Sequence, residues 1–397
     1  MKSIKDVNFK GKKVLVRVDF NVPLDENRNI TDDTRMHESM PTIKKLLNDG
    51  AAVILISHLG RPNKGGFESE FSLKPVAKHL SEMLNKKVMF TQEVLVDKVA
   101  GLSANLEDGD VMLLENIRFY PGEINGDVAF AEKLSKLGDA YVNDAFGAAH
   151  RNNASTATIA RFFPNDKYFG FLMEHEVSNL HKLMNNPAKP YTAIVGGSKV
   201  SSKIEILKNL SPIVDNIIIG GGMTYTFLKA MGINIGTSIC EDDKIEVAKE
   251  LMEDLKKDKT KLLLPIDHVI ADKFDNEANI KFTDGQEITD GFMGMDIGNK
   301  SIELFKQTIL DSKTILWNGP MGVFEMPSFS KGTFAIAGFI AQATKNGAFS
   351  SVGGGDSVAA VNQSGFGDQI SYISTGGGAM LEYLEGKTLP GIKAIMD

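Results

Sequence analysis

Short β-branched runs alternate with amphipathic stretches along the whole of this 397-residue chain. Runs that predict strands lie at residues 14–18, 52–57, 111–114 and 140–143, and then at 191–195, 216–219, 261–264, 314–317 and 348–352. Helical patterns separate them at 35–48 and 73–84, and later at 200–210, 242–257 and 331–344. Strands that alternate with helices are typical of parallel sheets with helical crossovers, so the sequence predicts an α/β protein.

The pattern occurs twice, on either side of one interruption. Residues 171–184 predict a single amphipathic helix, and the densest cluster of helix breakers in the chain follows at 185–190. A chain of this length is also too long for one ordinary core. We therefore expect two lobes, each a doubly wound, mostly parallel sheet flanked by helices. Their expected bounds are 1–170 and 187–382, joined by a hinge helix at 171–186.

Composition restricts the partners that the chain can have. A net charge of −7 argues against nucleic acid or an anionic membrane surface as a partner. Cys240 is the only cysteine, which excludes an internal disulfide and is typical of a reducing compartment. No window approaches the ~18 apolar residues that span a bilayer, and no export signal is visible. These features predict a cytoplasmic protein with small ligands.

Arginine and glycine are distributed unevenly along the chain. All seven arginines lie between Arg17 and Arg161, whereas 26 of the 38 glycines follow Gly170. Arginine binds carboxylates and phosphates through a planar fork of donors, and clustered glycines expose backbone N–H groups to phosphate oxygens. The distribution favours two anionic ligands held in different ways. The alternative is that the glycines only mark turns and that the arginines have drifted to lysine in the second half.

Polar residues follow each predicted strand of the first half. In doubly wound sheets, ligands bind beyond the carboxyl ends of the strands. Any one such arginine is more often a surface residue, but several at corresponding positions favour a single small ligand with two negative charges. Arg17, inside a strand, and Arg161, beside two phenylalanines, are assigned structural roles. The candidate ligand-binding residues are Asp19, Asn21, Arg35, His58, Arg61, Arg118 and Arg151.

Glycine clusters follow the strands of the second half. Gly353, Gly354 and Gly355 precede Asp356 and Ser357 at the start of a predicted helix, where backbone amides and the helix dipole favour phosphate. Asp356 stands where a Mg²⁺ carried by the phosphates needs a carboxylate. Further clusters are Gly196-Gly197 with Lys199 and Lys203, predicted to lie one helical turn apart, and the triplets 220–222 and 376–378. Glu325 is a candidate acceptor for ribose hydroxyls.

Two common nucleotide motifs are missing from the sequence. It contains neither GxxxxGK[ST] nor GxGxxG, so neither a P-loop nor the standard dinucleotide fingerprint is available. Each glycine triplet alone also fits close helix–sheet packing. Four clusters at strand-to-helix junctions nevertheless favour a nucleotide.

Taken together, these motifs closely resemble the phosphoglycerate kinase family over essentially the whole chain. The resemblance is carried by residues 14–23, 57–62, 113–119, 144–151, 196–204, 317–325, 353–357 and 374–378, in family order. It implies reversible phosphoryl transfer from 1,3-bisphosphoglycerate to ADP, giving 3-phosphoglycerate and ATP in glycolysis. It further implies a monomer of two lobes that close on a hinge, with Mg²⁺ accompanying ADP or ATP. The C-terminal segment, 383–397, is expected to pack on the first lobe.

The resemblance also assigns roles to residues. The seven candidate residues of the first half are implied to bind the phosphoglycerate. The implied nucleotide-binding residues are Gly197, Lys199, Lys203, Gly220, Gly294, Asn318, Glu325, Gly353, Gly354, Gly355, Asp356 and Ser357. Arg35 and Lys199 are expected to contact the transferring group, assisted by the backbone amides of Gly376, Gly377 and Gly378.

Two other functions remain open at this point. One is a kinase for a different carboxylate, such as acetate, although four arginines favour a larger and doubly charged acceptor. The other is a two-lobed anion- or nucleotide-binding protein without catalysis. Such a protein needs no second cradle for a Mg-nucleotide.

Overall fold

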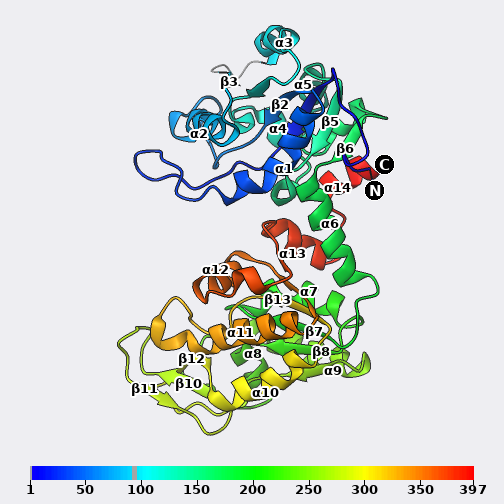
Figure 1. Ribbon diagram of the computed structural model, residues 1–397. Coiled ribbons are helices and arrows are strands. Elements are labelled where there is room, and N and C mark those ends of the chain that lie inside the picture. Colours follow the sequence, from blue (N-terminus) through cyan, green and yellow to red (C-terminus); the bar gives the residue numbers. More distant parts are fainter. Residues whose placement is uncertain (1, 92–95) are drawn as a thin grey trace. The chain divides into compact units, whose positions relative to one another are not determined.

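The computed structural model describes residues 2–91 and 96–397. The chain divides into two compact units, of which the first comprises Met1–Ser178 with Thr388–Asp397 and the second comprises Asn179–Lys387. Helix α6 (Phe171–Met184) forms where the sequence predicts it and contributes residues to both units. Each unit is built around its own six-stranded sheet (Figure 1).

In the described part of the first unit, six parallel strands form the sheet in the order β3-β4-β2-β1-β5-β6. The strands are β1 (Lys13–Arg17), β2 (Ala52–Ile56), β3 (Val88–Phe90), β4 (Val111–Leu113), β5 (Ala140–Asn143) and β6 (Lys167–Phe169). β1 and β2 lie at the centre and are almost wholly buried, because helices cover both faces. The sequence predicted the four inner strands but not the edge strands β3 and β6, which are less completely buried.

Helices of the first unit flank this sheet. They are α1 (Thr34–Asn48), α2 (Lys74–Leu84), α3 (Val96–Ala104), α4 (Pro121–Ile124), α5 (Val128–Ser135) and α14 (Pro390–Met396). α14 comes from the end of the chain and packs in the first unit, where Lys167 Nζ donates to the Ala394 carbonyl at 2.9 Å. Gly391 N also donates to Ala149 O at 2.9 Å. Because the start of the chain belongs to the same unit, its two ends lie there together (Figure 1).

In the described part of the second unit, a six-stranded parallel sheet has the order β15-β14-β13-β7-β8-β9. Its strands are β7 (Tyr191–Val195), β8 (Asn216–Ile219), β9 (Lys261–Leu263), β13 (Thr314–Asn318), β14 (Phe349–Val352) and β15 (Tyr372–Ile373). The predicted mostly parallel α/β architecture is therefore confirmed in both units. A small antiparallel sheet was not predicted, and it consists of β10 (His268–Ala271), β11 (Ile280–Phe282) and β12 (Met293–Ile297).

Helices cover the parallel sheet of the second unit as well. They are α7 (Ile204–Leu210), α8 (Met223–Ala230), α9 (Ile245–Lys257), α10 (Asn299–Leu310), α11 (Lys331–Lys345), α12 (Gly355–Gln363) and α13 (Gly378–Leu384). One prediction needs correction, because residues 200–210 do not form a single α-helix. A 3₁₀ turn over Val200–Ser202 precedes α7, and Lys203 between them has φ −124°, which is outside the helical range. Lys199 and Lys203 therefore do not lie on one turn of an α-helix.

Candidate active site

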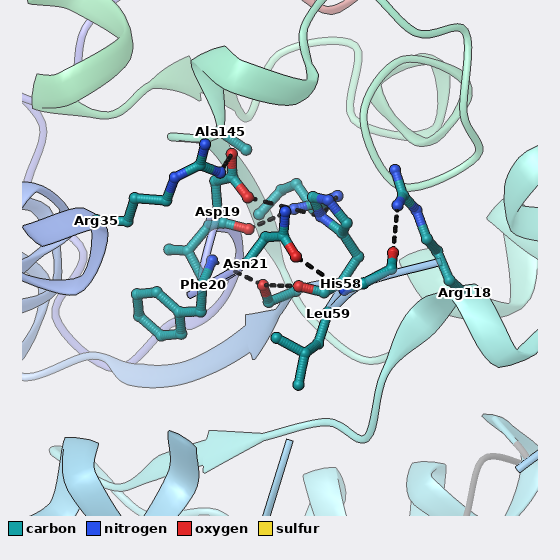
Figure 2. Close-up of polar contacts among 12 residues, drawn as sticks. Asp19, Phe20, Asn21, Arg35, His58, Leu59, Arg118 and Ala145 are labelled. Atoms are coloured by element: carbon teal, nitrogen blue, oxygen red, sulfur yellow. Dashed lines mark hydrogen bonds and ion pairs between the residues drawn. The ribbon is translucent and has the colours of Figure 1, made fainter. Parts of the chain in front are cut away.

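In the first unit, Asp19 lies between two of the predicted ligand-binding side chains. It follows β1 and is 7% exposed. Its Oδ2 accepts a hydrogen bond from Arg35 Nη1 at 2.7 Å, and its Oδ1 lies 3.7 Å from His58 Nδ1 (Figure 2). Among the described residues, Oδ1 has no hydrogen-bond partner. The carboxylate thus orients the Arg35 guanidinium and keeps one lone-pair site available for a ligand hydroxyl.

His58 is buried beside this carboxylate and contacts an arginine. Arg17 Nη2 lies 3.1 Å from His58 Nδ1. Burial, followed by the charges of Arg17, Arg151 and Arg35, holds the pKa of His58 well below its usual range. Arginine can only donate, so His58 Nδ1 must accept and its proton must sit on Nε2. The imidazole is therefore a neutral donor among cationic groups.

Two further predicted residues hold the loop that carries His58. Asn21 Oδ1 accepts from Gly60 N at 2.8 Å, and Arg118 Nη1 donates to Gly60 O at 2.6 Å (Figure 2). Arg118 binds the loop through one nitrogen, which leaves other donors of its guanidinium for a ligand. Arg151 Nε lies 3.3 Å from His150 Nε2, and Arg61 is exposed. The structure thus brings Asp19, Arg35 and His58 into one cluster and Asn21 and Arg118 to its adjoining loop.

Arg17, which the sequence analysis assigned a structural role, anchors a buried network of hydrogen bonds. Its side chain is 1% exposed, and its Nε donates to Ser155 Oγ at 2.9 Å while another nitrogen donates to the Val18 carbonyl. Ser155 in turn donates to Glu123 from Oγ at 2.7 Å and from N at 2.8 Å. Burial raises the pKa of Glu123, and the Arg17 charge opposes that rise. The sequence signal that could have revealed this network is a charged residue at the end of a buried, apolar strand.

In the second unit, the residues predicted to form a phosphate cradle lie around the N-terminus of α12. Asn318, at the end of β13, is 1% exposed and donates from Nδ2 to Gly353 O at 2.7 Å. Lys203 Nζ donates to Asn318 Oδ1. Gly354 has φ 91°, and a Cβ there would lie 2.7 Å from Asn318 Nδ2, so only glycine fits. Burial lowers the pKa of Lys203, and the charges of Asp356 and Glu385 oppose that shift.

A cavity of about 400 Å³ lies beside this cradle, within the second unit. Four predicted nucleotide-binding residues line it: Gly197, Gly294, Glu325 and Asp356. Gly220 does not line it, because it packs against the Met321 side chain. Lining residues that the sequence analysis missed are Tyr225, Ile239, Phe274, Met293, Met295 and Val323. Except for Val323, which lies within the motif 317–325, no motif marks these side chains, which come from segments far apart in the sequence.

The remaining predicted residues lie outside the cavity lining. Lys199 is exposed, and Gly376 N donates to Ser374 Oγ at 3.1 Å just before α13. Gly377 precedes that helix at φ 50°. Within the residues that the structure describes, no group of three or more His, Cys, Asp or Glu side chains could hold a metal ion. Asp356 offers one carboxylate beside the cradle, and Glu325 lines the same cavity.

The architecture and both clusters can be compared with known proteins. The family model for phosphoglycerate kinase matches residues 4–387, which is nearly the whole chain. The chain belongs to the phosphoglycerate kinase family. It is accordingly a kinase that transfers phosphate to the carboxyl group of 3-phosphoglycerate, and the comparisons do not favour the binding protein without catalysis.

Individual phosphoglycerate kinases agree with this assignment. The chain is 50% identical to the phosphoglycerate kinase of Porphyromonas gingivalis, with 99% of each chain covered. It is 51% identical to the cytosolic phosphoglycerate kinase 3 of Arabidopsis thaliana, covering 99% of this chain and 97% of that one. The solved phosphoglycerate kinase of Coxiella burnetii superposes with a TM-score of 0.91 at 40% identity, covering 99% and 98%. Among the described helices of this family member, none is both long and apolar enough to span a bilayer.

Proposed function

We propose that the first unit binds the phosphoglycerate and that the second binds the nucleotide. The observation that supports this division is that the two units offer different kinds of binding groups. The cluster of Asp19, Arg35 and His58 offers a hydroxyl acceptor, a guanidinium and a neutral imidazole donor. The second unit instead offers a largely apolar cavity beside glycines and Lys203. The first suits a small hydroxylated dianion, and the second suits a base with a phosphate chain.

Phosphoryl transfer then needs positioning and charge stabilisation more than covalent chemistry. In the forward direction, the bond between the C1 carboxylate oxygen and the phosphoryl group breaks, and a terminal oxygen of ADP forms the new bond to phosphorus. Neither nucleophile needs deprotonation, so no general base is assigned. Arg35 and Lys199 stabilise the charge on the transferring oxygens, together with the amides of Gly376, Gly377 and Gly378. The two units close around the substrates, which excludes water from the transferring group.

Mg²⁺ accompanies the nucleotide in this proposal. Asp356 lies in the first turn of α12 and lines the cavity beside the cradle, which fits a hard cation held by phosphates, waters and one carboxylate. When bound, the ion supplies charge neutralisation on the phosphate oxygens. We also propose that the enzyme acts as a monomer in the cytoplasm, in keeping with its single cysteine and its acidic net charge.

The first test is the reaction itself. ATP-dependent phosphorylation of 3-phosphoglycerate, coupled to NADH oxidation through glyceraldehyde-3-phosphate dehydrogenase, is expected to be rapid with Mg²⁺ and negligible without it. With acetate as the acceptor, for which release of ADP is followed instead, no turnover is expected. Turnover with acetate alone would instead support the other carboxylate kinase. A folded sample that binds both ligands but gives no turnover would contradict the proposed roles of Arg35 and Lys199.

Asp356→Ala is expected to weaken binding of Mg-ADP and to leave 3-phosphoglycerate binding intact. The reason is that its carboxylate lies in the nucleotide cavity of the second unit. Isothermal titration calorimetry with each ligand alone measures both affinities. Asp368→Ala, which removes a carboxylate from a turn outside the cavity lining, is the matched control. Loss of both affinities together would indicate misfolding and contradict the role given to Asp356.

Arg118→Ala is expected mainly to raise KM for 3-phosphoglycerate, with a smaller effect on kcat. The side chain is tied to the Gly60 carbonyl at 2.6 Å, so it is suited to bind the end of the substrate that does not react. An interaction that is equal in the ground state and the transition state changes KM and leaves kcat largely unaltered. Steady-state kinetics with varied 3-phosphoglycerate at saturating ATP checks this. A fall in kcat at unchanged KM would place Arg118 at the reacting group instead.

A further inference from the structure

Asp296 is a buried carboxylate behind the nucleotide cavity to which neither the motifs nor the proposed mechanism gives a role. It lies in β12, is 1% exposed, and follows Gly294 and Met295, which line the cavity. The pairing of β10 with β12 shifts register at this point, because Val269 pairs with Asp296 whereas Ile270 pairs with Gly294. Met295 is therefore the extra residue of a bulge, a feature that often re-aims groups beside active sites.

The carboxylate of Asp296 joins β12 to the start of α11. Its Oδ1 accepts from Ile297 N at 2.8 Å, and its Oδ2 accepts from Gly332 N at 2.7 Å, in the first turn of the helix. Protonation would place a hydrogen on one of the two oxygens, which keeps acceptor capacity but accepts more weakly. The ionised form therefore binds both N–H groups most strongly, because hydrogen bonds to a charged acceptor are the stronger ones.

The loop of residues 319–325 packs on the same carboxylate. Gly322 approaches Asp296 so closely that a Cβ there would run into Oδ1. Val323 N donates to Met295 O at 2.9 Å, which uses the carbonyl of the bulge residue. In α11, Thr333 Oγ1 accepts from Met321 N at 3.1 Å and from Gly322 N at 3.3 Å. The loop is thus fixed against β12 and α11 at once.

This loop and β12 form two walls of one cavity. Residues 320–323 and Glu325 line it from the loop, and residues 293–295 line it from β12. We propose that Asp296 is a positioning residue for the nucleotide, which sets the separation of these two walls by holding α11 and the loop against β12. The inference rests on the proposal that this cavity takes the nucleotide.

The surroundings of Asp296 make this contact sensitive to pH. The charged and titratable groups around it are Lys331, from the start of α11, and Tyr225, from α8, whose ring packs at 52° to the ring of His268 from β10. Burial raises the pKa of Asp296 to about 7, and the two N–H donors and Lys331 oppose that rise. As pH falls through this value the carboxylate gains a proton, and its hydrogen bonds to Ile297 N and Gly332 N lose their charge assistance. Nucleotide affinity should therefore fall with it.

The test is Asp296→Asn, which keeps the shape but turns an amide donor toward one of the two N–H groups. Calorimetry at pH 8 is expected to show about a tenfold rise in Kd for ADP, the size for a lost charge-assisted hydrogen bond. The Kd for 3-phosphoglycerate should not change. Asp267→Asn is the matched control, because Asp267 is also buried and accepts from Lys300 N at 2.9 Å and Ser301 N at 2.8 Å at the start of α10. It does not line the cavity, so ADP binding should persist.

A pH series adds a readout that general destabilisation would not produce. The ratio of the variant Kd to the wild-type Kd, in which titration of ADP itself cancels, is expected to be larger at pH 8 than at pH 6. If Asp296→Asn leaves the ADP Kd within twofold, or if both variants weaken ADP equally, the proposal is wrong. If Asp296→Asn fails to fold, Thr333→Val is the second variant. It removes the hydroxyl that accepts from Met321 N and Gly322 N of the same loop, and it is expected to raise the Kd for ADP as well.

The location of the nucleotide is tested separately. Methyl-labelled methionines in the wild-type protein report on the cavity, because Met293, Met295 and Met321 line it. Addition of ADP is expected to shift these three methyl resonances. If ADP binds and they do not move, the cavity assignment fails, whatever the Asp296 variant shows. If they move and the variant is unaffected, only the role of Asp296 is overturned.

Discussion

Replacement of Arg35 by alanine is expected to lower kcat by about 100-fold or more, the usual cost of removing a donor that stabilises charge in the transition state. Arg35 uses Nη1 to bind Asp19 at 2.7 Å, and its side chain keeps 37% of its surface exposed. The carboxylate thus orients the guanidinium, while its other nitrogens stay free for the transferring group. Steady-state kinetics with both substrates saturating measures the effect directly.

The expected effect of Arg35→Ala on kcat has a matched control variant in the same unit. Arg161→Ala removes an exposed arginine charge from the 3₁₀ turn over Thr158–Phe162, and kcat should remain within about twofold of wild type. Equal and modest effects of Arg35→Ala on kcat and KM would make Arg35 a binding residue only. Arg35→Lys should recover little activity, because lysine cannot reproduce the planar fork.

Replacement of Arg17 by alanine is expected to lower the unfolding free energy of the first unit by about 3–5 kcal/mol, the cost of removing one partner from a buried charged pair. Arg17 is 1% exposed and reaches Glu123 through Ser155, so the change leaves a buried carboxyl group without its compensating cation. Urea unfolding followed by circular dichroism should show this loss. Trp317, the only tryptophan, lies in β13 of the second unit, so its fluorescence transition should move less.

The loss of stability caused by Arg17→Ala should also depend on pH. Burial raises the pKa of Glu123 in the folded state, so its contribution favours folding at low pH and is lost as pH rises through the folded pKa. Removal of the Arg17 charge takes away an influence that lowers this pKa. The deficit of the variant relative to wild type is therefore expected to grow as pH rises through the folded pKa of Glu123, which lies above its ordinary value. A deficit that is equal at every pH would show that Glu123 is not coupled to Arg17.

Much of the parallel architecture could be predicted from sequence, because buried strands combine β-branched residues with clear boundaries. β5, β7, β8 and α6 have the predicted bounds to the residue. The antiparallel sheet could not be predicted. The three residues of its edge strand β11, Ile280–Phe282, are all exposed. The strand therefore has no buried face that would give it an alternating pattern of apolar residues.

The polar parts of the two sites were predictable for a related reason. Residues that follow parallel strands gather at one sheet edge, which brought Asp19 and His58 together with Arg35. The apolar wall of the cavity was not predictable. Tyr225 and Phe274 come from α8 and from a loop after β10, and packing alone brings them to one cavity. Asp296 was missed because a single carboxylate in a strand has no distinguishing sequence pattern.

The position of α14 has a consequence for the order of events during synthesis. The helix is made from Pro390–Met396 and packs against β6 and the 3₁₀ turn over Thr158–Phe162 in the first unit. A ribosome must therefore make all of Asn179–Lys387 before the first unit can gain this helix. Domains otherwise tend to fold in order from the N-terminus. Here the unit that begins first gains α14 only after the second unit has been made, and Lys167 lacks the Ala394 carbonyl until then.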